Sequence, residues 1–263
     1  MSNINNFVLL SNVIVNKKFN KLYKFSNFDI PQLCHSDLFV ELIETFPIKE
    51  LKYFFDNVNN LECLDGEKWK PIHYVTRYSK PEIIKYVIDK GVDIECKNNN
   101  NRTPLHFGLM YSTPDVVMYM IKKGVRIDES DCNKWTPLHM ALRYSTPSIV
   151  KYLIDNTNDL SGTLESSTLD GWKPIHLAIR YSSDDTVRYL VLKGVNLESI
   201  DREGWKPIHY ALRYASAELV KFLLDYGIDE KCVTDGGYSL VDFALKFSTP
   251  EIVNYFKDNH NLL

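Results

Sequence analysis

The sequence predicts an all-α fold built from stacked pairs of short helices. One segment recurs with a period of 33 residues, a proline stands at the same place in each regular copy, and apolar residues recur at helical spacing on both sides of a short turn. The prolines lie 33, 33, 37 and 33 residues apart, at Pro71, Pro104, Pro137, Pro174 and Pro207. One helix pair cannot bury its apolar face alone, so neighbouring copies must stack to form a core.

The copies divide the 263 residues into a non-repeating amino-terminal segment, a degenerate first repeat, five regular repeats and a carboxy-terminal capping repeat. The expected bounds are 1–35, 36–68, 69–101, 102–134, 135–171, 172–204, 205–236 and 237–263. We expect the first segment to cap the stack or to be partly disordered. The copy at 135–171 is about four residues longer than its neighbours, and Gly and Ser cluster there, which predicts a longer loop.

Each copy carries signals for two helices. Pro207 suits the first turn of a helix, where the missing N–H of proline costs nothing. Ile208, Ala211 and Leu212 then follow on one face of that helix. Threonines suited to N-cap the second helix precede a proline in three copies, at Thr113, Thr146 and Thr249. Glycines suited to end the second helix stand at Gly91, Gly124, Gly194 and Gly227.

These copies resemble the repeats of the ankyrin family. The resemblance rests on the T-P-L-H signature at Thr103–His106 and Thr136–His139, on its K-P-I-H variants, and on the I-V-K-Y-L pattern before a glycine. It covers roughly residues 36–263 and implies an ankyrin-repeat solenoid of helix-turn-helix units with short hairpin loops. One departure leaves the turn geometry open: the family's usual glycine after the first helix is replaced by Ser79, Ser112, Ser145, Ser182, Ala215 and Ser248. The composition also resembles the ankyrin families expanded in giant viruses of amoebae.

No part of the sequence predicts a catalytic residue, a cofactor or a metal site. It contains no phosphate-binding, metalloprotease, hydrolase or kinase motif. Five histidines recur in the signature, at His73, His106, His139, His176 and His209. Neighbouring copies lie about 8–10 Å apart, whereas zinc ligands lie about 2.0–2.1 Å from the metal. We therefore expect structural histidines. Glu95, Asp128 and Glu198 are expected to be solvated loop charges rather than a catalytic pair.

Charge and cysteine content narrow the possible partners. A formal net charge of -3 gives no general reason to expect nucleic acid or an acidic membrane. The early apolar stretch at 7–15 is far shorter than the roughly 20 residues of a membrane span. Five cysteines without a C-x-x-C pair favour reduced thiols in a cytosol-like compartment. We expect a cytoplasmic monomer, in the host cytoplasm if the protein is viral.

Three slots of the copies carry tryptophan, arginine and tyrosine, which are common at binding hot spots. We name their occupants the ladder residues and treat them as candidate partner-binding residues. They are Trp69, Arg77, Tyr78, Trp135, Arg143, Tyr144, Trp172, Arg180, Tyr181, Trp205, Arg213 and Tyr214. By resemblance to the family, these slots belong to the hairpin and to the exposed end of the first helix, on the concave face that binds partners. The copy at 102–134 breaks the pattern with Arg102 and Met110.

Two interpretations of the ladder residues remain open. They form a recognition surface, or each arginine stacks on rings of its own or the next copy and braces the stack; recent duplication alone would also give uniform copies. The leading function is a non-enzymatic scaffold that binds a protein partner on its concave face. The alternative is an adaptor that recruits a partner to a ubiquitin ligase through residues 1–60, with an F-box-like segment at 30–46. The same residues fit the first repeat, which we prefer.

Overall fold

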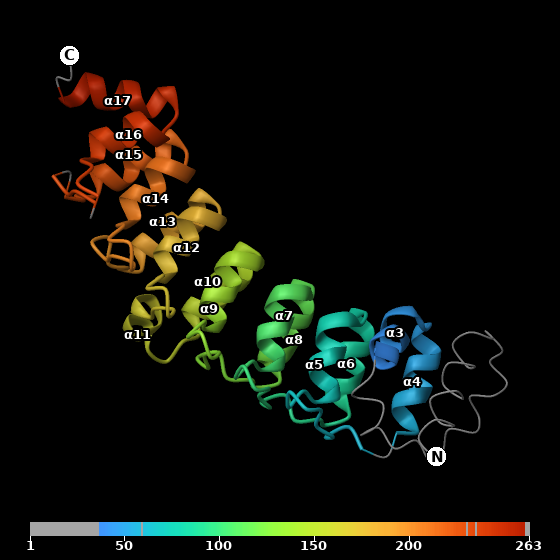
Figure 1. Ribbon diagram of the computed structural model, residues 1–263. Coiled ribbons are helices and arrows are strands. Elements are labelled where there is room, and N and C mark those ends of the chain that lie inside the picture. The colour runs from blue at the N-terminus through green and yellow to red at the C-terminus, as the bar shows by residue number, and fades with distance from the viewer. Residues whose placement is uncertain (1–36, 59, 230, 235, 261–263) are drawn as a thin grey trace. The chain divides into compact units, whose positions relative to one another are not determined.

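The computed structural model describes residues 37–260, apart from Asn59, Glu230 and Asp235 (Figure 1). The segment at 1–35, expected to cap the stack, lies outside the described residues. The chain divides after Arg126 into two compact units. Regular structure in the described residues is helical, with one isolated antiparallel bridge between Val233 and Ser239. Among these helices, none combines the length and the apolar character needed to cross a membrane.

The first unit stacks helix pairs whose first and second helices form two rows. The first helices are α3 (Asp37–Thr45), α5 (Pro71–Tyr78) and α7 (Pro104–Tyr111). The second helices are α4 (Ile48–Asp56), α6 (Pro81–Asp89) and α8 (Pro114–Lys122). Each helix packs on its equivalent in the neighbouring pair. The residues of the F-box-like segment from 37 onward thus form a first helix that packs like those of the regular copies.

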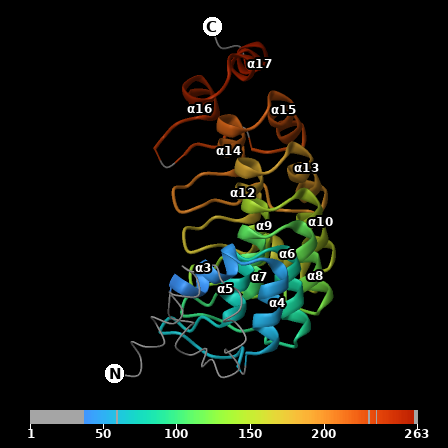
Figure 2. The same cartoon turned by 90° about the vertical axis from the view of Figure 1, so that its right-hand side faces the viewer.

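The second unit repeats this arrangement. Its first helices are α9 (Pro137–Tyr144), α12 (Pro174–Tyr181), α14 (Pro207–Tyr214) and α16 (Leu240–Phe247). Its second helices are α10 (Pro147–Asp155), α13 (Asp184–Leu192), α15 (Ala217–Asp225) and α17 (Pro250–His260). Figure 2 shows α9, α12 and α14 in one row and α10, α13 and α15 in another.

Short side chains and apolar stripes explain the close stacking. The alanines of the first helices, Ala141, Ala178, Ala211 and Ala244, are fully buried. The stripe of α6 that consists of Ile83, Ile84, Val87 and Ile88 is also buried. As expected, α5, α7, α9, α12 and α14 each begin at the signature proline. The sequence pattern therefore places both the helix starts and the buried faces correctly.

The serines that replace the family's glycine link neighbouring copies. Four of these serines, Ser79, Ser112, Ser182 and Ser248, end a first helix in extended conformation, and the hydroxyl of each donates to a backbone carbonyl of the preceding first helix. Ser182 donates to Leu142 at 2.8 Å, and Ser112 donates to Thr76 at 3.0 Å. A glycine would lack this hydrogen bond, so the departure from the family pattern adds a contact between repeats.

The threonines before the second helices do not cap them in the expected way. Thr113 and Thr146 occupy the N-cap position, but their hydroxyls make no capping hydrogen bond to the backbone. Thr113 instead donates to the Asp115 carboxylate, and the Thr146 hydroxyl pairs with that of Ser148 at 2.9 Å. The polar side chain two residues further on therefore replaces the backbone as the partner of each hydroxyl.

The longer loop expected in the copy at 135–171 contains a helix, α11 (Leu160–Glu165). The Asp159 carboxylate caps it by accepting a hydrogen bond of 2.8 Å from the Gly162 N–H. Leu164 is buried, which anchors the helix to the unit. Gly and Ser favour loops in general, but here a cap and one buried leucine are enough to order the segment.

Candidate partner-binding surface

The hairpin before each first helix holds the tryptophan slot in place. In the second unit, the Asp201 carboxylate accepts hydrogen bonds of 2.9 Å from the N–H groups of both Glu203 and Trp205. The residue before the tryptophan adopts left-handed backbone geometry, with φ of 74° at Gly204 and 60° at Lys134. Since a carboxylate or hydroxyl in the turn fixes the backbone, the tryptophan enters the first helix in a defined orientation.

All four tryptophans among the ladder residues are half-buried rather than exposed. The Trp172 ring lies 5.1 Å from the Tyr210 ring of the next copy, and the Trp205 ring lies 5.1 Å from the Phe243 ring. Both pairs meet edge to face, an arrangement that pairs of aromatic rings prefer. The expectation of an exposed ladder is therefore wrong for its tryptophans, and an aromatic side chain of the following copy lies against three of them, Trp69, Trp172 and Trp205.

Each ladder arginine of the second unit lies over three aromatic rings. The guanidinium carbon of Arg180 is 5.1 Å from the centre of Trp172, 5.2 Å from Tyr181 and 5.1 Å from Tyr214. Arg143 contacts Trp135, Tyr144 and Tyr181, and Arg213 contacts Trp205, Tyr214 and Phe247, with all six distances between 5.0 and 5.7 Å. Two of the three rings belong to the same copy and one to the next. The nine ladder residues of this unit thus lie together.

Among its described residues, the first unit contains one such arrangement. The guanidinium carbon of Arg77 lies 5.8 Å from the centre of Trp69, 4.9 Å from Tyr78 and 5.0 Å from Tyr111 of the next copy. Met110 occupies the arginine slot in that next copy. A methionine carries no charge to place between rings, so the pattern stops there within this unit.

The tyrosines supply the exposed part of the ladder. Tyr144 is 47% exposed, and Tyr181 and Tyr214 are each 40% exposed. Tyr181 is covered by the guanidinium groups of Arg143 and Arg180, at 5.1 and 5.2 Å from its ring centre. Each of these tyrosines therefore keeps part of its side chain exposed while its ring lies against arginine.

The ladder arginines differ from the repeated lysines in their charge partners. Lys173 pairs with Glu165 at 2.7 Å, and Lys206 pairs with Glu198 at 2.6 Å. Within the described residues, no carboxylate oxygen lies within 4.0 Å of the guanidinium groups of Arg143, Arg180 and Arg213. The ladder of the second unit is therefore a row of positive charges held by rings alone.

A second set of contacts joins neighbouring second helices, and the sequence analysis did not predict it. In the first unit, the Asp89 carboxylate accepts hydrogen bonds from the Tyr119 hydroxyl and, at 2.7 Å, from the Lys123 ammonium group of the next copy. Lys123 lies 5.2 Å from the Tyr119 ring. These three residues are 30 and 34 positions apart, so a search for ion pairs at about one repeat period would have found them.

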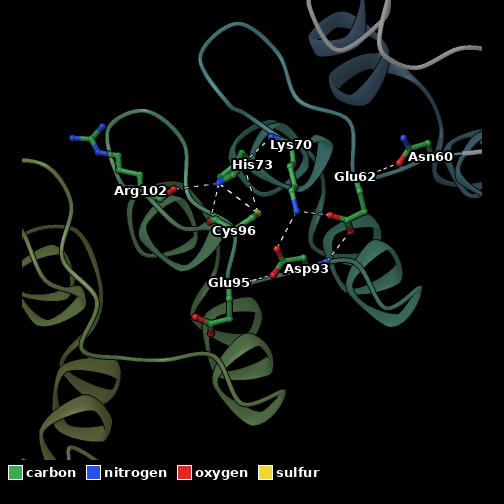
Figure 3. Close-up of polar contacts among 8 residues, drawn as sticks. All are labelled: Asn60, Glu62, Lys70, His73, Asp93, Glu95, Cys96 and Arg102. Atoms are coloured by element: carbon green, nitrogen blue, oxygen red, sulfur yellow. Dashed lines mark hydrogen bonds and ion pairs between the residues drawn. The ribbon is translucent and has the colours of Figure 1, made fainter.

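Two signature histidines, His73 and His176, have the expected structural role, because both ring nitrogens of each contact backbone groups. The Nδ1 atom of His73 accepts a hydrogen bond of 2.9 Å from the Lys70 N–H (Figure 3). The proton therefore resides on Nε2, which donates to the backbone carbonyls of Cys96 and Arg102, both at 3.2 Å. In this way the ring joins the start of its own first helix to the loop that leads to the next copy.

Burial shifts the pKa values of His73 and of its neighbour Cys96. It lowers the pKa of His73 to about 4 and raises the pKa of the Cys96 thiol to about 12. The Cys96 sulfur lies 3.7 Å from Nε2 of His73 (Figure 3). A neutral imidazole next to a neutral thiol is not the ion pair that activates a nucleophilic cysteine. In the described residues, no group of three His, Cys, Asp or Glu side chains could hold a metal ion.

The lysine of the K-P-I-H variant organises the loop carboxylates. Lys70 pairs with Glu62 at 2.6 Å and with Asp93 at 3.0 Å (Figure 3). Although desolvation works in the opposite direction, the hydrogen bonds to Glu62 and Asp93 raise the pKa of Lys70 above its usual value. Glu62 also accepts a hydrogen bond of 2.9 Å from the Asp93 N–H. The Glu62 carboxylate therefore binds both the lysine side chain and the backbone of the next loop.

Two of the carboxylates expected to be solvated loop charges have such structural roles. Glu198 accepts hydrogen bonds of 2.6 Å from Lys206 and 3.1 Å from the Asp229 N–H. Glu95 accepts hydrogen bonds of 2.6 Å from the Arg126 N–H and 3.2 Å from its side chain. Both glutamates remain partly exposed loop charges, and the hydrogen bonds to the loop of the next copy are an addition that the sequence did not predict. Asp128 is exposed.

Comparisons with known proteins agree with this architecture. The family model for ankyrin repeats in three copies matches residues 43–131, 72–163, 110–201 and 159–235. No curated protein matches the chain. The human ASB11 ankyrin repeat domain is 18% identical, with a TM-score of 0.64 over 82% of this chain and 94% of that chain. A chain from the complex of the Bd0816 predatory endopeptidase of Bdellovibrio bacteriovorus with immunity protein Bd3460 is 20% identical, with a TM-score of 0.61 over 73% of this chain and 98% of that chain.

At these identities, the two solved structures show a shared fold. The family matches together extend from residue 43 to residue 235, which is well over half of the chain. Helix pairs, signature prolines and structural histidines occupy the same region. The chain therefore belongs to the ankyrin-repeat family.

Proposed function

We propose that this chain is a non-enzymatic scaffold that binds a protein partner through its ladder residues. Ankyrin-repeat domains are typical protein-binding scaffolds. The observation that carries the proposal is the row of exposed tyrosines, Tyr144, Tyr181 and Tyr214, held against arginines in the second unit. Tyrosine and arginine are enriched among the residues that dominate binding energies.

The side chains of this surface are already ordered, which favours binding of a partner. Binding costs free energy when flexible side chains become ordered, about 0.5–1.5 kcal/mol for each rotamer-rich side chain. Arg180 already lies over three rings, so much of this cost has been met before a partner arrives. The half-buried tryptophans contribute by holding the rings of neighbouring copies in place rather than by direct contact.

The proposal places the partner on the concave face, as in the family. The resemblance to ankyrin families of giant viruses extends it to a viral protein that acts in the host cytoplasm. It does not include recruitment of a ubiquitin ligase, because α3 and α4 pack on α5 and α6 as a repeat. Residues 1–36, the remaining part of that adaptor hypothesis, lie outside the described residues.

Affinity capture with matched variants tests the proposal. The test variant replaces Tyr144, Tyr181 and Tyr214 with serine. The control is Tyr226→Ser, which replaces a tyrosine that is 53% exposed and ends α15. We expect the parent and the control to capture the same partner and the triple variant to lose it, with helical circular dichroism retained in all three. Equal capture by the triple variant would refute the proposal.

A further inference from the structure

We propose that the ladder of the second unit binds an extended acidic segment in polyproline II conformation, with a carboxylate at every third residue. This inference rests on the proposed function, because it names the chemistry of the partner for the same surface. It is carried by three observations: the charge of the arginines, their spacing and the covered faces of the tyrosines.

The charge argument comes from the contrast between arginine and lysine. The lysines that recur in the second unit, Lys173, Lys193 and Lys206, each pair with a carboxylate of the chain. Arg143, Arg180 and Arg213 have no carboxylate within 4.0 Å among the described residues. Their charge is held on aromatic rings, so the N–H groups stay available to an external carboxylate, which arginine binds in bidentate geometry.

The spacing argument sets an upper bound on the distance between neighbouring arginines, and so on the spacing of the carboxylates that they would bind. Arg143 and Arg180 contact the same Tyr181 ring, at 5.1 and 5.2 Å from its centre. Their guanidinium carbons therefore lie at most about 10 Å apart, close to the distance between packed helices. Arg180 and Arg213 share Tyr214 in the same way. A polyproline II helix has three residues per turn and rises about 9.3 Å per turn, so its every third side chain lies on one side.

This conformation suits the surface better than a β-strand. In a strand, side chains alternate between two faces, and residues three apart point in opposite directions. In polyproline II they point in the same direction and match consecutive arginines. The exposed edges of Tyr181 and Tyr214 lie between the arginines, where they can contact the two intervening residues of each turn.

The tyrosine faces argue against single-stranded nucleic acid on this surface. Such ligands bind by stacking bases on aromatic faces, in addition to phosphate contacts. Tyr181 and Tyr214 are each covered by two guanidinium groups. A base would have to displace an arginine, whereas a carboxylate would bind the arginine where it lies.

A synthetic peptide with three Glu-Pro-Pro triplets tests the inference with the full-length chain. The first comparison peptide replaces each Glu with Gln, and the second has the same composition with the three Glu residues adjacent. Binding is measured by fluorescence anisotropy at about 0.15 M salt. The variants are Arg180→Gln and Arg213→Gln, with Arg188→Gln as control, because Arg188 lies 4.2 Å from the Phe222 ring outside the ladder.

We expect the Glu-Pro-Pro peptide to bind the parent and the Arg188→Gln control equally. Because each substitution removes the charged donor of a bidentate pair, Arg180→Gln and Arg213→Gln should each weaken binding at least about tenfold. The Gln peptide and the adjacent-Glu peptide should also bind at least about tenfold more weakly. All variants should retain parental helical circular dichroism.

Three results would overturn the inference. They are equal binding of the two Glu peptides, no binding of the Glu-Pro-Pro peptide, and displacement of that peptide by single-stranded oligothymidylate that depends on Arg180. If the peptides fail while partner capture still depends on the three ladder tyrosines, the acidic segment is refuted and the scaffold function stands. If capture is also independent of those tyrosines, the proposed function fails as well.

Discussion

The guanidinium group of Arg180 lies 5.1 Å from the ring centre of Tyr214, which belongs to the next repeat. The same group lies over Trp172 and Tyr181 of its own repeat. One cation therefore links two copies through three rings. Contacts of this kind contribute about 0.5–2 kcal/mol each, depending on solvent access. The ladder therefore links neighbouring repeats of the second unit.

Replacement of both Trp172 and Trp205 with alanine should destabilise the chain. Each ring packs on an aromatic side chain of the next copy at 5.1 Å and is half-buried, so we expect a loss of about 1–3 kcal/mol per site. Urea unfolding followed by circular dichroism measures this loss. Leu192→Ala is the control, since Leu192 is 75% exposed and should change stability by less than about 0.5 kcal/mol. If the double variant matches that control, the tryptophans do not brace the repeats.

The serine links between first helices predict a pair of opposite effects. Ser182→Ala removes the hydrogen bond of 2.8 Å to Leu142 and should lower the free energy of unfolding by about 1 kcal/mol. Ala215 occupies the same slot in the next copy and has no hydroxyl group. Ala215→Ser should therefore add a link and raise the free energy of unfolding by about 0.5–1 kcal/mol. Changes of the same sign in the two variants would contradict this role.

Left-handed backbone at Lys134 predicts a stabilising substitution. Its φ is 60°, a conformation that costs an L-residue about 1–2 kcal/mol, and glycine relieves this cost but loses more chain entropy on folding, which offsets about half of the relief. Lys134→Gly should raise the free energy of unfolding by about 0.5–1 kcal/mol. Gly171→Ala should have the opposite effect, because the new Cβ would lie 2.8 Å from the Arg202 nitrogen. A thermal melt of each variant against the parent checks both signs, and a lower melting temperature for Lys134→Gly would count against the assigned geometry.

The buried histidines predict a loss of stability as the pH falls. Burial lowers the pKa of His176 from its usual value of about 6.5 to about 4. Between these values the unfolded chain binds the proton and the folded chain does not, so the free energy of unfolding decreases as the pH falls. From pH 7 to pH 5 the contribution of one such histidine is about 2 kcal/mol. The decrease should therefore be about 2 kcal/mol smaller in His176→Gln, as measured by urea unfolding at both values; equal decreases would exclude this linkage.

The period predicted the helices because each signal is local. Pro174 starts α12 since proline suits the first helical turn, and Ala178 is buried since its slot recurs on one face. His176 was assigned a structural role from the signature and from the spacing of the copies, and it donates to the Ser199 carbonyl at 3.3 Å. Features set within one repeat were therefore accessible to sequence reasoning.

Features that depend on the neighbouring repeat could not be predicted from the sequence. Whether Trp172 faces solvent depends on Tyr210, which lies 38 positions away and covers it. The Ser182 hydroxyl donates to a backbone carbonyl 40 positions away. Every residue has such a carbonyl, so the identity of the residue gives no sign of this bond. The α11 helix was missed because one cap and one buried leucine outweighed its Gly and Ser content. Each missed feature is a contact between copies or a local effect of tertiary packing.

A footprint of the bound partner tests the central claim most directly. The partner recovered by affinity capture is added to the intact chain, and backbone hydrogen exchange is followed by mass spectrometry. If the ladder binds the partner, protection should increase in the hairpins and first helices at 168–181 and 201–214, and the second helices α13 and α15 should exchange as in the free chain. Protection confined to α13 and α15, with the ladder segments unchanged, would contradict the account.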